Sequence, residues 1–175
     1  SSSLEEETLN IINELDLKTV LVETKDNEGR LPSVYIDNIE ATYEATKHLL
    51  DKGIKNIAFI GVDKSSANAW RDRYIGYKKA LNEAGITIDE DLVYFEGLKV
   101  KSGYRASEKF LASGKNFDGI ICASDEIAMG AINGLREKGV TTPEDVSVIG
   151  FNDNAVASYF YPKLTTVKQP SYDMG

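Results

Sequence analysis

The fold is decided by the stretch Ile120-Ile121-Cys122-Ala123-Ser124-Asp125-Glu126-Ile127-Ala128-Met129. An apolar run ends, a Ser-Asp-Glu triplet follows, and apolar residues then recur at helical spacing. This pattern predicts a buried strand that passes into a helix without a long loop. Ser124 is a typical helix-capping residue, and the two carboxylates after it suit the positive end of the helix dipole. In an open parallel sheet, such a turn lies at the carboxyl ends of the strands, where ligands bind.

Similar strand and helix patterns come before and after this stretch. Strand-like runs at 56–61, 92–95 and 145–150 alternate with helical patterns at 41–52, 70–84, 103–111 and 127–138. Alternating strands and helices with short connections are typical of right-handed βαβ units. We therefore expect an α/β fold, with a doubly wound, mainly parallel sheet in a three-layer αβα arrangement.

The two ends of the chain do not belong to this series. A capping box at Ser3 and Glu6 begins a helix, and short strands follow at 20–22 and 33–36. At the other end, 164–167 is strand-like and 170–175 has the pattern of the beginning of another helix. We expect a two-lobed protein that is truncated at both ends, with crossings near Asp37 and Thr165. The expected parts are an N-terminal lobe fragment at 1–36, a C-terminal lobe at 37–165 and a crossover back at 166–175.

Composition excludes several classes of protein. The 175 residues are 42% hydrophobic and 27% charged, with a formal net charge of −8. No apolar run approaches the roughly 20 residues that span a bilayer. The single cysteine, Cys122, excludes disulfides within the chain, so a cytoplasmic protein is the simpler interpretation. The basic residues are dispersed among acids and form no stripe, so this segment alone is not expected to bind DNA.

Enzyme motifs are absent from the sequence. The only histidine, His48, lies in a helical pattern far from any serine or cysteine turn, and a surface or packing role is expected for it. The sequence contains neither the phosphate-binding motif Gly-x-x-x-x-Gly-Lys nor the motif Gly-x-Gly-x-x-Gly. No cluster of histidines and cysteines suggests a zinc site. We expect no enzymatic activity, no cofactor and no metal.

Polar side chains instead follow the predicted strands, where each strand ends. Trp70 and Arg73 come after the loop behind 56–61, Leu98 comes after 92–95, and Ser124 opens the turn described above. Asn152 and Asp153 follow 145–150. Hydroxyl, amide, carboxylate and guanidinium groups that meet at one edge can hydrogen-bond a polar small ligand, with an apolar or aromatic wall beside it.

Each of these residues also has a purely structural interpretation. Ser124 can serve only as a helix cap, and Asn152 with Asp153 can form an Asx turn. Arg73 can pair with an acid on its own helix, and Trp70 can pack in the core. The sequence leaves these alternatives open, although the shared position at strand ends favours a ligand site.

Several motifs occur in a characteristic order and spacing. They are PSVYIDN at 32–38, HLLDKG at 48–53 with IAFIG at 57–61, RYIGY at 73–77, SDEIAMGA at 124–131, PEDVSVIGFND at 143–153 and PKLTTVKQP at 162–170. Together they resemble the effector-binding core of the lactose/galactose-repressor family of bacterial transcription regulators. The resemblance covers nearly the whole chain. It implies a two-lobed fold like that of type I periplasmic binding proteins, with a small ligand held between the lobes.

The resemblance also implies roles for particular positions. The family's ligand-contacting arginine falls on Arg73, the residue that opens the Ser/Asn-Asp-Glu motif falls on Ser124, and the first acid of Gly-Phe-Asp-Asp falls on Asn152. The aromatic wall of the pocket falls on Leu98. Asn152 carries no charge and Leu98 has no ring, so both depart from the family pattern. The implied ligand-binding set is Arg73, Ser124, Asn152, Leu98, Asp153 and Trp70.

The implied function is that of a sensor. The chain would be the effector-binding domain of a repressor that responds to a small sugar or similar polar metabolite, and DNA would be bound only through a headpiece absent from this chain. A solute-binding protein of a sugar transporter, which shares the fold, is the alternative. The family also implies a homodimer and no contact with a membrane. The residues expected at the dimer interface are Ala128, Ile132, Tyr159, Phe160 and Tyr161.

Overall fold

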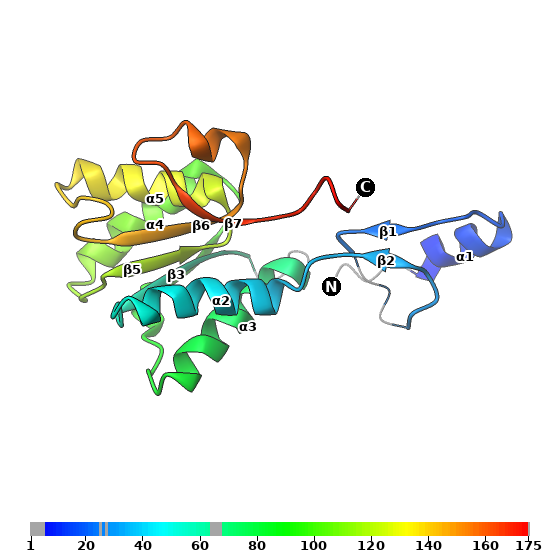
Figure 1. Cartoon of the computed structure of the whole chain (residues 1–175), viewed down its shortest axis with the longest axis horizontal. Coiled ribbons are helices and arrows are strands. Elements are labelled where there is room, and N and C mark those ends of the chain that lie inside the picture. Colours follow the sequence, from blue (N-terminus) through cyan, green and yellow to red (C-terminus); the bar gives the residue numbers. More distant parts are fainter. Residues whose placement is uncertain (1–5, 25, 27, 64–67, 175) are drawn as a thin grey trace.

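A five-stranded parallel sheet forms the centre of the larger part of the molecule (Figure 1). The computed structural model describes residues 6–24, 26, 28–63 and 68–174. The strands lie in the order β4-β3-β5-β6-β7, and every neighbouring pair is parallel. Their bounds are β3 Ile57–Val62, β4 Val93–Glu96, β5 Gly119–Cys122, β6 Ser147–Asn152 and β7 Thr165–Lys168. Because the strands are parallel, their carboxyl ends all lie at one edge of the sheet.

Helices cover both faces of this sheet, as the alternating pattern predicted (Figure 1). On one face lie α2 (Asn38–Asp51) and α3 (Asn68–Glu83), and on the other α4 (Val100–Ala112) and α5 (Asp125–Glu137). A short 3-10 helix precedes β4 (η1, Glu90–Leu92) and another follows β6 (η2, Ala155–Ser158). The prediction of a three-layer α/β fold is confirmed.

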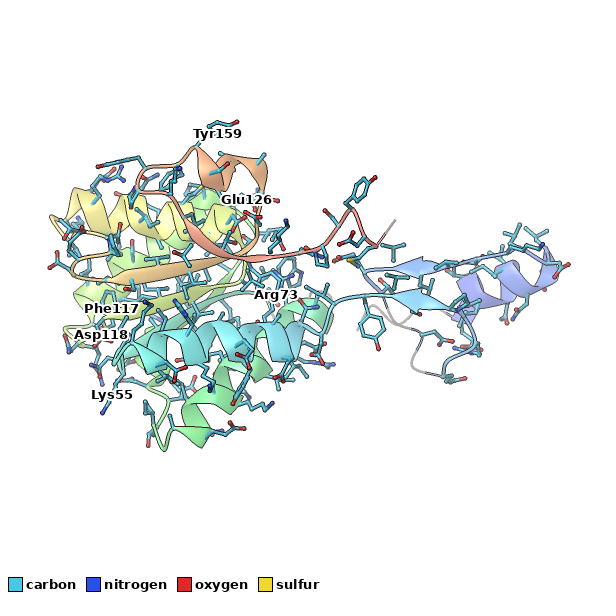
Figure 2. The ribbon with its side chains drawn as sticks, viewed as in Figure 1. Lys55, Arg73, Phe117, Asp118, Glu126 and Tyr159 are labelled. Atoms are coloured by element: carbon cyan, nitrogen blue, oxygen red, sulfur yellow. The ribbon has the colours of Figure 1, made fainter. Side chains whose placement is uncertain are left out.

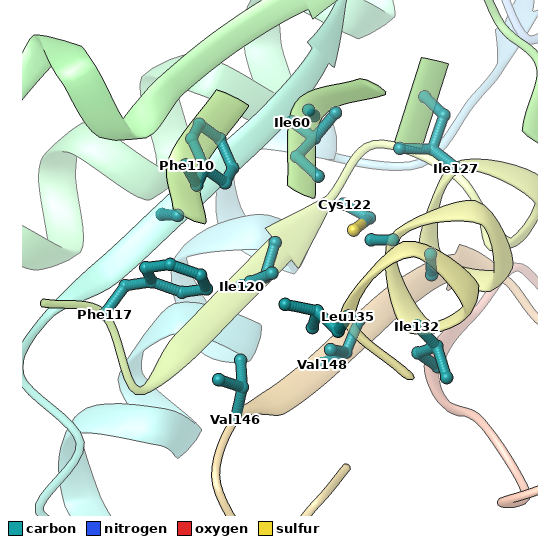
Figure 3. Close-up of a cluster of buried hydrophobic side chains, with 14 of the residues drawn as sticks. Ile60, Phe110, Phe117, Ile120, Cys122, Ile127, Ile132, Leu135, Val146 and Val148 are labelled. Atoms are coloured by element: carbon teal, nitrogen blue, oxygen red, sulfur yellow. The ribbon is translucent and has the colours of Figure 1, made fainter. Parts of the chain in front are cut away.

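The apolar core lies in two layers, one on each side of the sheet. Ile120 and Cys122 of β5 pack with residues of α4 and α5, whereas Ile121 between them packs with residues of α2 and α3. Successive residues of a strand point to opposite faces, so the continuous apolar run of β5 fills both layers. Figure 3 shows the first layer, where Phe110 of α4 and Leu135 of α5 meet the strand.

The first elements of the chain form a separate, smaller sheet. Helix α1 (Glu6–Glu14) precedes β1 (Leu21–Val22), which pairs in parallel with β2 (Ser33–Val34). Figure 1 shows these elements beside the larger part, reached through the crossing segment 35–37 that leads from β2 into α2. After β7 the chain runs back toward them, and the Gln169 side-chain amide donates a hydrogen bond to the Glu23 carboxylate. Assignment of these parts to two lobes stays a prediction.

Some boundaries differ from those the sequence predicted. The last strand of the series begins at Ser147 rather than at residue 145, because the Asp145 carboxylate accepts hydrogen bonds from the Thr141 amide and hydroxyl. The expected helix at the end of the chain is wrong over the described residues, where 171–174 form turns. Ser3 of the predicted capping box lies outside the described residues. Among the helices described, none combines the length and the apolar character needed to cross a membrane.

Candidate functional site

Arg73 lies near the start of α3, at the carboxyl edge of the sheet, and only 3% of it is exposed (Figure 2). Its Nε donates a hydrogen bond to Asn38 Oδ1 at 2.9 Å, and Nη1 donates to the backbone carbonyl of Ala123. Burial lowers the pKa of Arg73 to about 10, against the opposing effect of the Glu23 and Asp125 carboxylates. The side chain is therefore a charged guanidinium at neutral pH, held at the end of β5.

Two aromatic rings enclose this guanidinium. Its Cζ lies 3.6 Å from the ring centroid of Phe151 and 4.6 Å from that of Trp70. Such cation–π contacts strengthen when water is excluded. Arg73 thus connects α3 with the end of β6, where Asn152 follows Phe151. The alternative of a surface ion pair does not hold, because Arg73 lies inside the molecule. Trp70 both packs against the core and contacts the cation.

Ser124 caps α5, as the structural alternative predicted. Its Oγ accepts a hydrogen bond from the Ile127 amide at 3.3 Å, and the residue is fully buried. Its backbone carbonyl also accepts the hydrogen bond that begins the helix, from the Ala128 amide. Arg73 donates to the carbonyl of Ala123, the residue directly before Ser124, so Arg73 and Ser124 lie close together as predicted. A contact of Ser124 with a ligand stays a prediction.

The next residue, Asp125, joins three elements, which the sequence did not reveal. Its Oδ1 accepts from the Thr166 hydroxyl of β7 at 2.5 Å, and its Oδ2 accepts from the Asn154 amide at 2.7 Å. Burial raises the pKa of Asp125, and these two hydrogen bonds oppose that shift. A Cβ at Gly150 would lie 2.4 Å from Oδ1, so glycine there lets β6 approach the carboxylate. Asp125 therefore fixes the loop after Asn152 to the start of α5.

Asn152 and Asp153 have unusual backbone angles. Their φ values are +108° and +57°, a region that residues other than glycine rarely adopt and that asparagine and aspartate tolerate best. An Asx turn from Asn152 would use the Asn154 amide, which donates to Asp125 instead. Asp153 is exposed, and its amide donates to Thr166 Oγ1 at 3.3 Å. Strained backbone at a strand end is a common feature of ligand sites.

Leu98 lies at the same edge of the sheet but away from this group. It follows β4, which is separated from β6 by β3 and β5. Its side chain is 43% exposed. The structure thus brings Arg73, Trp70, Ser124 and Asn152 together, and Asp153 follows Asn152 in the chain. Leu98 lies apart from them, beyond the end of the edge strand β4. The sequence had missed Phe151, Asn38 and the linking role of Asp125.

The predicted dimer residues fall into two groups. Ala128 and Ile132 are 0% and 2% exposed because they pack in the chain's own core against the sheet. Their assignment to a dimer interface is therefore wrong, since neither presents a side chain to a partner. Tyr159 and Tyr161 are 86% and 85% exposed, and Figure 2 shows Tyr159 at the outer surface beyond α5. Phe160 between them is half-buried against the core.

Among the residues that the structure describes, the groups able to carry out covalent chemistry lie apart or are buried. Within the described ranges, no three His, Cys, Asp or Glu side chains are placed to hold a metal ion. Cys122 is buried, and burial raises the pKa of its thiol, which keeps it protonated. His48 lies in the last turn of α2, far from Asn38 at the start of that helix, which contacts Arg73. The groups gathered around Arg73 are suited to hydrogen bonding and to stacking.

Comparison with known proteins gives consistent matches. The periplasmic binding protein-like domain matches residues 46–175. The chain is 63% identical to the HTH-type transcriptional regulator RegA of Clostridium saccharobutylicum, over 100% of this chain and 53% of that protein. It is 34% identical to the HTH-type transcriptional repressor PurR of Glaesserella parasuis, over 99% of this chain and 51% of that one. The chain therefore spans about half the length of the curated relatives it matches.

Solved structures agree with these matches. A sugar-binding transcriptional regulator of the LacI family from Escherichia coli, complexed with phosphate, superimposes with a TM-score of 0.89 at 32% identity. The match covers 97% of this chain and 60% of that one.

Proposed function

The chain belongs to the lactose/galactose-repressor family of bacterial transcription regulators, and from this membership we propose that it senses a small sugar or similar polar metabolite for a DNA-binding repressor. The DNA is bound by a headpiece outside this chain, and the whole protein acts in the cytoplasm, where the DNA is. The relatives are regulators and not enzymes, which favours a binding role over catalysis. They also disfavour the alternative of a transporter's solute-binding protein.

The observation that carries this proposal is the environment of Arg73. Among the described residues, its hydrogen-bond partners are an amide and a peptide carbonyl, and no carboxylate lies within ion-pair distance. A buried charge whose described hydrogen-bond acceptors are all neutral is costly, and such groups are concentrated at functional sites. Acceptors among the described residues take two of its five N–H groups, and we propose that a ligand hydroxyl or carbonyl accepts from one or more of the remaining three.

The neighbouring residues favour an uncharged, polyhydroxylated ligand. Asn152 brings an amide, which both donates and accepts hydrogen bonds, to the position where the family pattern has a carboxylate. Trp70 and Phe151 provide flat apolar faces beside the guanidinium. A sugar offers the hydroxyl groups and the apolar ring face that match these two kinds of surface.

A thermal-shift screen of the full-length protein tests the proposal. We expect at least one compound among pentoses, hexoses and nucleobases to stabilise the protein and to be recovered unchanged. At a hundredfold excess over the Kd, the gain is about 2.7 kcal/mol, which raises the Tm by about 5–10 °C. Glycerol at the same concentration serves as the control for nonspecific polyol effects. A screen without any such shift, or a compound that is turned over, would contradict the proposal.

The exposed aromatic segment 158–161 supports a homodimer as part of this proposal. Exposed apolar patches mark interaction sites, and tyrosine is enriched at protein–protein interfaces. A pocket of about 310 Å³ lies beside them, and Arg136, Val140, Pro143, Tyr161 and Pro162 are among the residues that line it. In a two-fold dimer, this pocket can receive a tyrosine from the partner subunit.

The substitution Tyr159→Asp is expected to dissociate this dimer. A buried aromatic anchor contributes about 2 kcal/mol or more. In a two-fold dimer each substitution removes two such anchors, so dimerisation weakens about a thousandfold. Sedimentation equilibrium of the full-length protein measures this change. Tyr172→Asp is the matched control, because Tyr172 is also highly exposed, at 94%, but lies outside the segment. A wild-type protein that stays monomeric at high concentration would refute the dimer.

A further inference from the structure

Asn38 occupies the junction between the crossing segment 35–37 and α2. Its Nδ2 donates a hydrogen bond to the Ile36 carbonyl at 3.3 Å, and its Oδ1 accepts from Arg73 Nε at 2.9 Å. The cap of α2 is a different residue, since Asp37 Oδ1 accepts from the Ile39 and Glu40 amides at 3.0 Å each. The Asn38 side chain is therefore not needed to begin the helix, and it links the crossing backbone to Arg73.

This link determines how the guanidinium is oriented. Asn38 holds the Nε side of the group and the Ala123 carbonyl holds Nη1, so the plane of the guanidinium cannot rotate while both bonds remain. The rings of Phe151 and Trp70 lie against the same group. Without Asn38, the cation would still be buried, but rotation about its Cδ–Nε bond would be less restricted.

The spacing between Asn38 and Arg73 is itself fixed by close helix packing. A Cβ at Gly76 of α3 would lie 2.2 Å from the Ile39 carbonyl oxygen and 2.9 Å from the Tyr43 amide nitrogen of α2. The two backbones are therefore in direct contact one turn after Arg73. Because α3 cannot slide along α2 here, a displacement of the crossing segment acts on the hydrogen bond between Asn38 and Arg73.

We propose that Asn38 is a positioning residue, which holds the Arg73 guanidinium in its orientation and couples that orientation to the backbone of the crossing segment 35–37. A movement of the two sheets relative to each other changes the path of this segment, and Asn38 transmits the change to Arg73. By reciprocity, a ligand that reorients Arg73 acts on the crossing. The inference rests on the proposed function only for the statement that Arg73 contacts the effector.

Fluorescence of Trp70 tests, without an effector, whether Asn38 holds the Arg73 guanidinium in position. Trp70 is the only tryptophan of the chain, and its ring lies 4.6 Å from the Arg73 guanidinium carbon, so its emission responds to that group. Spectra are recorded on the full-length protein, and a Trp70→Phe variant supplies the background from any other tryptophan. The difference between wild type and Arg73→Ala defines the full effect of losing the guanidinium.

We expect Asn38→Ala to reproduce the larger part of that difference. Asn38→Asp keeps an acceptor for Arg73 Nε, so its spectrum should stay close to that of wild type. Asn82→Ala is the matched control, because Asn82 is an exposed asparagine on α3. Circular dichroism confirms that each variant is folded, and Asn38→Ser replaces Asn38→Ala if the latter does not fold.

Unchanged emission in Asn38→Ala, or an equal change in Asn82→Ala, would overturn the inference. An equal loss in Asn38→Asp and Asn38→Ala would also overturn it, because the acceptor would then not matter. A failed effector screen leaves this measurement unaffected, and a successful screen with unchanged emission refutes only the role of Asn38.

Discussion

Replacing Arg73 with alanine is expected to abolish effector binding by the full-length protein while the protein stays folded. The substitution removes every hydrogen bond from the guanidinium to the ligand. Charge-assisted hydrogen bonds contribute about 1.5–3 kcal/mol each, so the loss of two weakens binding at least about hundredfold. Isothermal calorimetry with the compound found in the thermal-shift screen measures this loss.

The protein itself should tolerate this substitution at a moderate cost. Alanine leaves Asn38 Oδ1 and the Ala123 carbonyl without their donor, which costs about 1–3 kcal/mol for each group that water does not reach. It also removes a buried cation whose desolvation the folded state must offset. The two effects oppose each other, so a reduced but cooperative unfolding transition is expected.

Arg71→Ala provides the matched control for Arg73→Ala. Arg71 lies two residues earlier on α3, is exposed, and approaches Asp72 only to 4.0 Å. Exposed ion pairs of this kind contribute little, so its loss should leave both affinity and stability nearly unchanged. Unchanged affinity in Arg73→Ala, or an equal loss in Arg71→Ala, would remove Arg73 from the ligand site.

The sequence predicted the parallel sheet and the polar turn at its carboxyl edge because both follow from local patterns. The apolar run of β5 and the Ser-Asp-Glu turn after it identify a buried strand and a helix start within ten residues. The partners of Arg73 could not be predicted in this way, since Asn38 is 35 residues away in the chain. Asp125 and Thr166 are separated by 41 residues. Periodicity indicates which face a side chain occupies, but not which distant group it contacts.

The wrong assignment of Ala128 and Ile132 has a physical cause of the same kind. Helix α5 is buried on most of its surface, because α4 packs against it beside the sheet. Apolar residues on such a helix fill the core of the chain, and their sequence pattern does not distinguish this from an interface with a partner. The glycines of α5 were the sequence feature that indicated packing against another helix of the same chain, since glycines on a helix permit a neighbouring helix to approach closely.

The glycines at this helix contact should be the positions least able to accept a side chain. A Cβ at Gly130 of α5 would lie 1.8 Å from the Val100 carbonyl oxygen, and one at Gly103 of α4 would lie 1.8 Å from the Ile127 carbonyl oxygen. Both obstacles are helix backbone, which cannot rotate away as a side chain can. We therefore expect Gly130→Ala and Gly103→Ala to force α4 and α5 apart, at a cost of about 3 kcal/mol or more each.

Thermal unfolding of the full-length protein measures this cost, with a Tm lowered by about 6–12 °C or loss of soluble protein as the expected result. Gly97→Ala is the matched control, because Gly97 has open space around its Cβ position and its φ lies outside the left-handed region that favours glycine. Equal stability of Gly130→Ala and Gly97→Ala would show that the helices have room to move. Helix α5 begins at Asp125 and is capped by Ser124, so any displacement that Gly130→Ala causes also reaches the residues around Arg73, where we propose that the effector binds. A folded Gly130→Ala protein should therefore bind its effector more weakly, which Gly97→Ala should not.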